Sequence, residues 1–133
     1  MVSSKGLRPD ADVPLVGIVD SDVAFRTALD SLIRSVGYRS AIFGSGTAFL
    51  ESGDKQEISC LILDLNIPGL SGFEVLHRLA KMNYLIPPTI LFGDNDGELR
   101  EEALRRGAVA VLQKACSDEN LLAALASALQ LSM

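Results

Sequence analysis

Three charged side chains follow three short apolar segments of this sequence, which makes them the best candidates for shared chemistry. They are Asp20 after residues 15–19, Asp64 after residues 58–63, and Lys114 two positions after residues 108–112. A carboxylate beside a tight turn can act as a nucleophile, an acceptor or a metal ligand, and a nearby ammonium can pair with a bound anion. A lone aspartate in such a place usually starts a turn. Two further charged residues in equivalent positions favour a common site.

The elements that must position these residues alternate regularly along the chain. Apolar segments predict strands at residues 15–19, 39–43, 58–63, 89–92 and 108–112. Apolar residues at helical spacing and capping residues predict helices at 22–36, 47–51, 71–79, 98–106 and 117–129, with a polar connection at 54–57. Because parallel strands require crossover helices, this order predicts an α/β fold with a single doubly wound five-stranded parallel sheet and helices on both faces. Asp20, Asp64 and Lys114 then share the carboxyl edge.

Composition restricts the class of protein. The chain has 133 residues, of which 48% are hydrophobic, so we expect one globular domain at residues 15–133. Residues 1–14 lack an apolar core of the kind found in signal peptides, and we expect a flexible leader there. The net charge of -5 argues against direct nucleic-acid binding or binding to an anionic membrane. No segment has the roughly 20 apolar residues of a membrane span. Cys60 and Cys116 provide no disulfide framework, and we expect a cytoplasmic location.

The most specific stretch of the sequence follows Asp64. It reads DLNIPGLSGFEVL over residues 64–76, and ALRRGA over residues 103–108 and Lys114 add independent support. In these residues the chain resembles response-regulator receiver domains of two-component systems, over about residues 15–130. The resemblance implies a (βα)5 flavodoxin-like fold and a signalling module rather than an enzyme.

The resemblance also implies a role for each residue of the edge. Asp64 would be the phosphoacceptor, receiving a phosphoryl group from a sensor histidine kinase or a phosphotransfer protein. Asp20 would be one of two acids that hold Mg²⁺, together with Asp64 and the backbone carbonyl of Asn66. Lys114 would pair with a phosphoryl oxygen. The cation and the ammonium would neutralise the charge that opposes attack by a carboxylate on an anionic phosphoryl group.

Several positions depart from the pattern of this family, and they predict an atypical member. Ser21 stands where the second acid usually contacts the metal, and a hydroxyl is a weak Mg²⁺ ligand, so metal affinity should be reduced. Phe92 replaces the Thr or Ser that hydrogen-bonds the phosphoryl group. Thr89 cannot replace it, because it lies on the opposite face of the strand. Val111 occupies a position where a switch aromatic is common. Ala115 replaces a proline, so no cis peptide is expected after Lys114.

These departures leave a second class of function open. Phe92 could plug the pocket of a phosphorylation-independent pseudo-receiver that binds a partner constitutively. A hydrolase is a weaker alternative, since Asn66 stands where aspartate-based phosphatases need a second acid. The acids of residues 94–97 do not fit a calcium loop and are expected to cap the following helix. The charge-rich helix at residues 98–106, with the last strand and helix, is a candidate face for homodimerisation, although a solvated helix with internal ion pairs is an equally good interpretation.

Overall fold

The computed structural model describes residues 13–84, 86–93 and 97–131. Its strands are β1 (Leu15–Val19), β2 (Arg39–Phe43), β3 (Cys60–Asp64), β4 (Thr89–Phe92) and β5 (Ala110–Leu112). Its helices are α2 (Val23–Ser35), α3 (Gly46–Glu51), α4 (Gly72–Lys81), α5 (Gly97–Arg105) and α6 (Asp118–Leu131), with a 3₁₀ helix η1 (Gly53–Glu57) where a polar connection was predicted. The predicted leader, apart from its last two residues, and the predicted caps at residues 94–96 lie outside the described residues.

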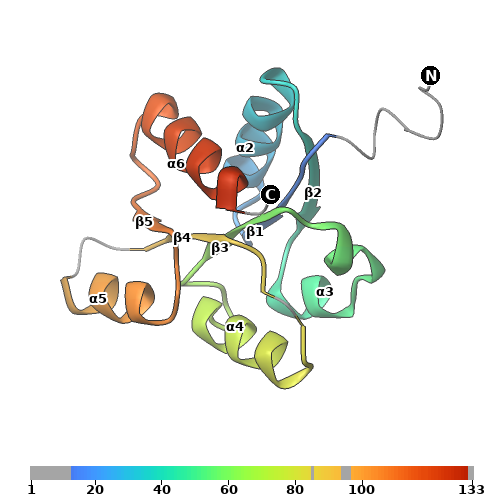
Figure 1. The fold of residues 1–133 in the computed structure, drawn as a ribbon, viewed down its shortest axis with the longest axis vertical. Coiled ribbons are helices and arrows are strands. Elements are labelled where there is room, and N and C mark those ends of the chain that lie inside the picture. The colour runs from blue at the N-terminus through green and yellow to red at the C-terminus, as the bar shows by residue number, and fades with distance from the viewer. Residues whose placement is uncertain (1–12, 85, 94–96, 132–133) are drawn as a thin grey trace.

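The five strands form one parallel sheet in the order β2-β1-β3-β4-β5. Helices α2 and α6 cover one face of the sheet, and α3, α4 and α5 cover the other (Figure 1). The predicted doubly wound α/β fold is therefore confirmed. In this arrangement the carboxyl ends of all five strands meet at one edge of the molecule.

Local sequence signals explain where the helices begin and end. Asp22 is the N-cap of α2, where its Oδ1 accepts a hydrogen bond from the N–H of Phe25 at 3.1 Å. Ser71 caps α4 in the same way. Gly37 follows α2 with a φ of 97°, a conformation that glycine adopts without a steric penalty. Asp22 and Ser71 were predicted to begin helices, because short polar side chains satisfy the free N–H groups of the first turn, and Gly37 was predicted to follow the end of one.

Two strands differ from their predicted bounds. β3 begins two residues later and extends to Asp64, because the N–H of Ile58 donates back to the carbonyl of Lys55 at 3.3 Å and completes the turn of η1. β5 also begins two residues later. The N–H of Ala108 donates to the carbonyl of Ala103 at 3.0 Å, so this residue still takes part in the turn that follows α5. Local turn hydrogen bonds therefore shorten both apolar segments.

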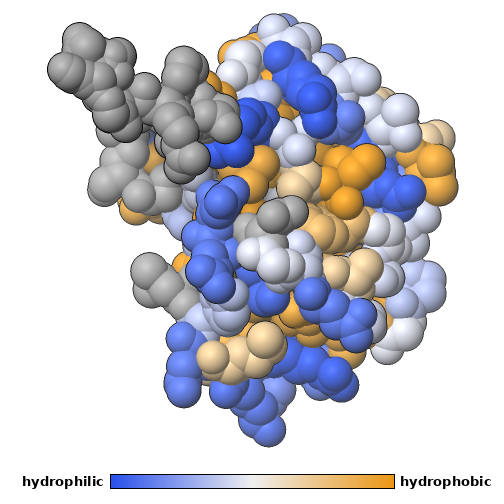
Figure 2. All heavy atoms as spheres, turned by 90° about the vertical axis from the view of Figure 1, so that its right-hand side faces the viewer, coloured by the Kyte–Doolittle hydropathy of each residue, from blue (hydrophilic) through white to orange (hydrophobic). Residues whose placement is uncertain are grey.

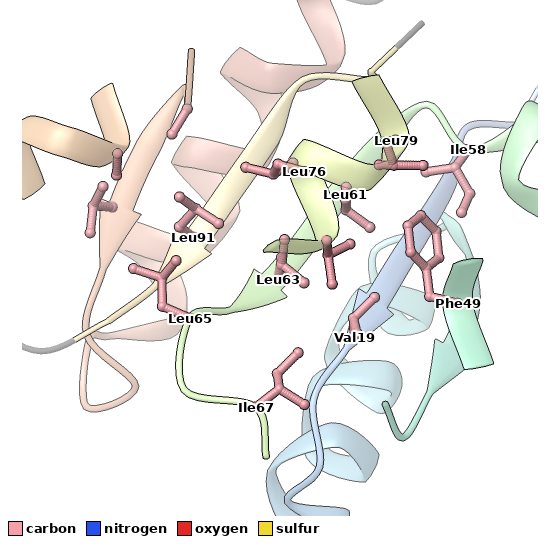
Figure 3. Close-up of a cluster of buried hydrophobic side chains, with 14 of the residues drawn as sticks. Val19, Phe49, Ile58, Leu61, Leu63, Leu65, Ile67, Leu76, Leu79 and Leu91 are labelled. Atoms are coloured by element: carbon pink, nitrogen blue, oxygen red, sulfur yellow. The ribbon is translucent and has the colours of Figure 1, made fainter. Parts of the chain in front are cut away.

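The sheet separates two apolar cores. Figure 3 shows the core under α3, α4 and α5, where Leu61, Leu63 and Leu91 of the sheet lie near Leu76 and Leu79 of α4. The second core lies under α2 and α6 and holds the alternate residues of the same strands, together with apolar residues of both helices. Its fully buried members include Val16, Ile18, Ile33, Cys60, Ile62, Ile90, Phe92 and Leu125. Both faces of the central strands are thus buried, as their continuous apolar sequences predicted.

The surface mixes hydrophilic and hydrophobic residues. Figure 2 shows both kinds interspersed over the face seen from the β2 and α3 side, and Ile42 of the edge strand β2 is 45% exposed. Both cysteines are free. Burial raises the pKa of the Cys60 thiol to about 12. Within the described residues, no helix has the length and apolar character needed to cross a bilayer.

Candidate functional site

Two carboxylates lie side by side at the carboxyl edge of the sheet. Ile18 of β1 and Ile62 of β3 are paired in register and both face α2 and α6. Side chains of a strand alternate between its faces, so Asp20 and Asp64, each two residues further along, continue the same row. Both side chains are buried, with 3% and 8% of their surface exposed. Two adjacent buried carboxylates require a nearby cation.

Lys114, which follows β5, supplies that cation. Its Nζ lies 2.9 Å from Asp20 Oδ2 and 3.1 Å from Asp64 Oδ2, and it donates a hydrogen bond to Asp20 Oδ1 at 3.1 Å. The two carboxylate oxygens are consequently no more than about 6 Å apart, the sum of their distances to Nζ. The structure thus brings together the three charged residues that the sequence placed at this edge. The hydrogen bond to Asp20 was not foreseen, since Lys114 was expected to pair with a phosphoryl oxygen.

The environment of Lys114 stabilises its charged form. Partial burial lowers the pKa of its ammonium, but the hydrogen bonds to Asp20 and Asp64 and the attraction of their charges outweigh burial and raise the pKa above its ordinary value. A raised pKa in the folded state contributes stability that is complete below the unfolded pKa and disappears as the pH rises through the folded value. The contribution of Lys114 is therefore fully present at neutral pH and is lost only in strongly alkaline solution.

We expect Lys114→Met to destabilise the fold at pH 7 by about 2 kcal/mol, because it leaves two buried carboxylates without a cation. This magnitude is below that of a fully buried pair, since 35% of the Lys114 side chain is exposed. Urea unfolding of the metal-free protein measures the loss. Asp20→Asn combined with Lys114→Met should recover part of it by removing one of the unpaired charges. An unchanged unfolding midpoint in the single variant would show that the ion pairs contribute nothing.

Local hydrogen bonds and close packing hold Asp64 in place. The N–H of Asn66 donates to Asp64 Oδ1 at 3.0 Å, so the turn after β3 fixes one carboxylate oxygen while Lys114 contacts the other. At Gly72, the first residue of α4, a Cβ atom would lie 3.0 Å from the Asp64 carbonyl and from Leu65 Cα. Only glycine allows α4 to approach the end of β3 this closely without a shift. The GLSGFE segment therefore packs the helix against the carboxylate turn.

The oxygen donors of the site match the chemistry of Mg²⁺. This ion is held by one or two carboxylates, and it keeps several waters. Asp20 Oδ2 is buried and, among the described residues, accepts no hydrogen bond, although it approaches Lys114 Nζ to 2.9 Å. It therefore retains lone pairs for another cation. The described residues contain no group of three acidic, histidine or cysteine side chains that could hold a metal.

Asp22, the acid that directly follows Ser21, has its side chain engaged at the start of α2. Its side chain caps α2 through the N–H of Phe25, and its own N–H donates to Asp20 Oδ1 at 2.8 Å. Ser21 itself is exposed. Among the described residues, Asp20 and Asp64 are the two buried carboxylates, and the carbonyl of Asn66 follows in the same turn as Asp64.

The two altered switch positions lie on opposite faces of the sheet. Phe92 is in register with Asp64 and packs in the core under α2 and α6, with 1% of its surface exposed. Val111 is buried in the other core, and its carbonyl accepts a hydrogen bond from Arg100 at 3.1 Å. Thr89 donates its hydroxyl to the carbonyl of Pro87, away from this edge. No cis peptide occurs in the described part of the chain, as expected for Ala115.

Two further residues contact the acidic cluster, and neither was singled out as functional from the sequence. Arg26 of α2 donates a hydrogen bond to the backbone carbonyl of Asp20 at 2.7 Å. The ring of Phe25, predicted only as an apolar core residue, lies under the ammonium of Lys114. Their positions in the first turn of a helix that begins at this edge were the available signal, because side chains of a first turn lie closest to the preceding loop.

A groove of about 1070 Å³ lies at the opposite, amino-terminal edge of the sheet, lined by residues such as Tyr84, Pro88 and Val109. Its polar side chains include Lys55, whose Nζ donates to the carbonyl of Ser52. None of the described residues that line the groove is a buried carboxylate. The acidic edge is therefore the site where paired charges and burial coincide.

Comparison with known proteins agrees with this geometry. The sequence model of the family described as "Response regulator receiver domain" matches residues 16–126, which include all three charged residues of the edge. The chain belongs to this family. The receiver domain is 38% identical over 118 residues to Response regulator protein TmoT of Ectopseudomonas mendocina, covering 89% of this chain and 54% of that protein. It is also 38% identical over 114 residues to Nodulation protein W of Bradyrhizobium diazoefficiens, covering 86% of this chain and 50% of that protein.

Solved structures show the same architecture. The crystal structure of a response regulator receiver protein from Burkholderia phymatum superposes with a TM-score of 0.76 at 34% identity, and the match covers 88% of this chain and 95% of that one. The chain spans about half the length of the curated relatives described above. The likeness to them therefore concerns the receiver domain.

Proposed function

We propose that this receiver domain accepts a phosphoryl group on Asp64 from a sensor histidine kinase or a phosphotransfer protein of a two-component phosphorelay. The observation that supports this best is the ammonium of Lys114, which lies within 3.1 Å of both Asp20 and Asp64 at the carboxyl edge of the sheet. A nucleophilic carboxylate beside a fixed cation is the arrangement that phosphoryl transfer requires. We propose a cytoplasmic location, in keeping with a kinase as the donor.

The transfer exchanges one bond to phosphorus for another. A carboxylate oxygen of Asp64 forms a bond to phosphorus as the bond from phosphorus to the imidazole nitrogen of the donor histidine breaks, and the nitrogen keeps the electron pair. The hydrogen bond from Asn66 and the contact with Lys114 orient the two oxygens before the donor arrives. Lys114 can then follow the negative charge onto a phosphoryl oxygen. The chain therefore acts as an acceptor that stores the group rather than as an enzyme that turns it over.

Asp20 and Asp64, with the backbone carbonyl of Asn66, would hold Mg²⁺. When bound, this ion neutralises negative charge on the phosphoryl oxygens. Asp20 Oδ2 supports this assignment, because among the described residues it contacts Lys114 Nζ at 2.9 Å but accepts no hydrogen bond. With Ser21 in place of an acid, we propose that affinity for the ion is weak.

Incubation with acetyl phosphate and millimolar Mg²⁺ tests the proposal. We expect intact-mass spectrometry to show a gain of one phosphoryl group that depends on Mg²⁺. Hydroxylamine should remove it, since an acyl phosphate reacts with this nucleophile. Absence of any adduct, from acetyl phosphate or from a phosphorylated histidine phosphotransfer domain, would overturn the proposed function.

Restoring an acid at position 21 should strengthen metal binding. We expect Ser21→Asp to lower the Kd for Mg²⁺ by about tenfold, because a carboxylate replaces a neutral hydroxyl among hard oxygen ligands. Isothermal titration calorimetry at fixed ionic strength measures the change. Ser21→Asn is the matched control, with the same shape and no charge. Equal affinities of all three proteins would show that position 21 does not contact the metal.

Phe92 favours a second candidate function, that of a phosphorylation-independent interaction module. Its ring is buried beside Asp64, in the register position where a hydroxyl would contact a phosphoryl group. A domain of this kind would bind its partner with the same affinity before and after treatment with a phosphoryl donor. The mass measurement described above separates the two functions, because only the acceptor gains mass.

We propose homodimerisation through the face formed by α5, β5 and α6. On this face, Arg105 and the following Arg106 form ion pairs within the chain. Glu102 accepts hydrogen bonds from Arg105 at 2.6 Å and Arg106 at 2.7 Å, which lower its pKa. Leu104 of the same helix is 44% exposed. We expect sedimentation velocity to show a dimer at high protein concentration that Arg105→Ala combined with Leu104→Glu weakens. A monomer of 14.2 kDa at every concentration would contradict the dimer.

A further inference from the structure

Phe25 of α2 lies against Lys114, the lysine that contacts both carboxylates. Lys114 Nζ lies 4.6 Å from the centroid of the Phe25 ring, within the range of a cation–π interaction. Phe25 in turn packs edge-on against Phe92, with ring centroids 5.1 Å apart and an interplanar angle of 89°. Such an edge-to-face pair is a favourable aromatic geometry and restricts the orientation of both rings.

Lys114 needs support beyond its ion pairs to remain in one place. Its ammonium sits at the end of a flexible four-carbon chain, and 35% of the side chain is exposed to water. An exposed lysine gains little from ion pairing, because ordering the chain costs entropy and water screens the charges. An aromatic face that covers part of the side chain reduces both losses. Phe25 is the aromatic residue in contact with Lys114 in the described part of the chain.

We propose that Phe25 is a positioning residue, whose ring holds the ammonium of Lys114 against Asp20 and Asp64. At the edge of the sheet, four residues are joined by contacts that lead from Asp20 back to Asp20. The N–H of Asp22 donates a hydrogen bond to Asp20, and the Asp22 side chain accepts one from the N–H of Phe25. The ring of Phe25 contacts the ammonium of Lys114, and this ammonium donates a hydrogen bond to Asp20. Because the cap of α2 is tied to the acid itself, the ring is fixed relative to the carboxylates.

Phe92 supports the position of the Phe25 ring, which a Thr or Ser in its place could not do. It is 1% exposed and is held in register beside Asp64, so it provides a fixed partner for the Phe25 ring. Threonine at position 92 could not make the edge-to-face contact. Phe92, in place of a Thr or Ser, therefore removes a hydroxyl donor from the site but supports Lys114 through the ring of Phe25.

A double-mutant cycle on stability tests the contact without relying on phosphorylation. We expect the effects of Phe25→Leu and Lys114→Met on the unfolding equilibrium constant to depart from additivity by about three- to tenfold, as a partly desolvated cation–π contact does. Phe43→Leu is the matched control. It breaks a similar aromatic pair with Phe49, with centroids 5.3 Å apart, in the other core, and should be additive with Lys114→Met within about twofold.

A departure from additivity of less than twofold between Phe25→Leu and Lys114→Met would overturn the proposal. Lys114→Gln replaces Lys114→Met in the cycle if the latter does not fold. Phe25→Tyr provides a rescue, since it keeps the aromatic face. In this variant, Lys114→Met should change the unfolding equilibrium constant by the same factor as it does in the unchanged protein.

A kinetic consequence rests on the proposed function. With acetyl phosphate as donor, we expect Phe25→Leu to slow phosphorylation by about three- to tenfold and Phe25→Tyr to restore the rate to within about twofold. In the Lys114→Met background, Phe25→Leu should have no further effect, because the residue acts only through the lysine. A slowed rate in that background would overturn the assignment. If the unchanged protein gains no phosphoryl group, the proposed function fails, while the stability cycle still decides whether Phe25 holds Lys114.

Discussion

Replacing Asp64 with asparagine is expected to abolish phosphoryl uptake from acetyl phosphate completely. The amide has nearly the same shape as the carboxylate but no negatively charged oxygen to attack phosphorus. Asp64→Asn keeps the position beside Lys114 and Asn66 while removing the nucleophile. Intact-mass spectrometry after incubation with Mg²⁺ should therefore show only the unmodified mass.

Asp30→Asn is the matched control for this experiment. Asp30 lies on α2, where it pairs with Arg34 and accepts a hydrogen bond from Ser40, so the same chemical change is made away from the acidic edge. This variant should gain the phosphoryl group as the unchanged protein does. If Asp64→Asn still gained mass, a different residue would be the acceptor, and the assignment of Asp64 would be wrong even though the family is established.

Truncation of Phe92 should have the largest effect on stability. Phe92→Ala removes a ring that is 1% exposed in the core under α2 and α6, and we expect a loss of about 3–5 kcal/mol in the free energy of unfolding. The loss combines the transfer of the ring and the cavity that it leaves. It also includes the edge-to-face contact with Phe25. Urea unfolding at pH 7 measures it.

Two further variants at position 92 separate volume from chemistry. Phe92→Leu retains most of the buried volume and should cost about 1 kcal/mol. Phe92→Thr leaves a similar void to alanine and adds a hydroxyl at the position in register with Asp64. We expect it to be about as unstable as Phe92→Ala. A loss below about 1 kcal/mol for Phe92→Ala would show that the ring does not fill a packed core.

The results at positions 64 and 92 together distinguish the two candidate functions. A phosphoacceptor gains mass at Asp64 despite the ring beside it, because attack requires only the carboxylate and its cations. An interaction module gains none, and Phe92→Thr would not change this unless the ring itself blocks access. Phosphorylation that appears only in Phe92→Thr would show that the aromatic ring keeps the site closed.

The sequence by itself determined the layered fold and the meeting of three charged groups. Continuous apolar strands separated by amphipathic segments allow only a parallel sheet covered on both faces, and such a sheet places Asp20, Asp64 and Lys114 at one edge. The two-residue alternation of a strand then fixes the side of the sheet on which Asp20 and Asp64 lie. These rules depend only on local residue patterns and on how parallel strands connect, so the amino-acid sequence is enough to predict both the fold and the placement of these residues.

Only the tertiary structure decided which groups share the ammonium. Lys114 contacts Asp20 as well as Asp64, and its ammonium also contacts the ring of Phe25, which is distant in sequence. These contacts depend on how α2 lies on the sheet and on the path of the chain after β5, which residue spacing does not specify. Residue spacing also did not specify the start of β3, because the local hydrogen bond from Ile58 to Lys55 draws the first residue of the apolar segment into a turn. Side-chain contacts across elements follow from packing, whereas the placement of strand ends follows from periodicity.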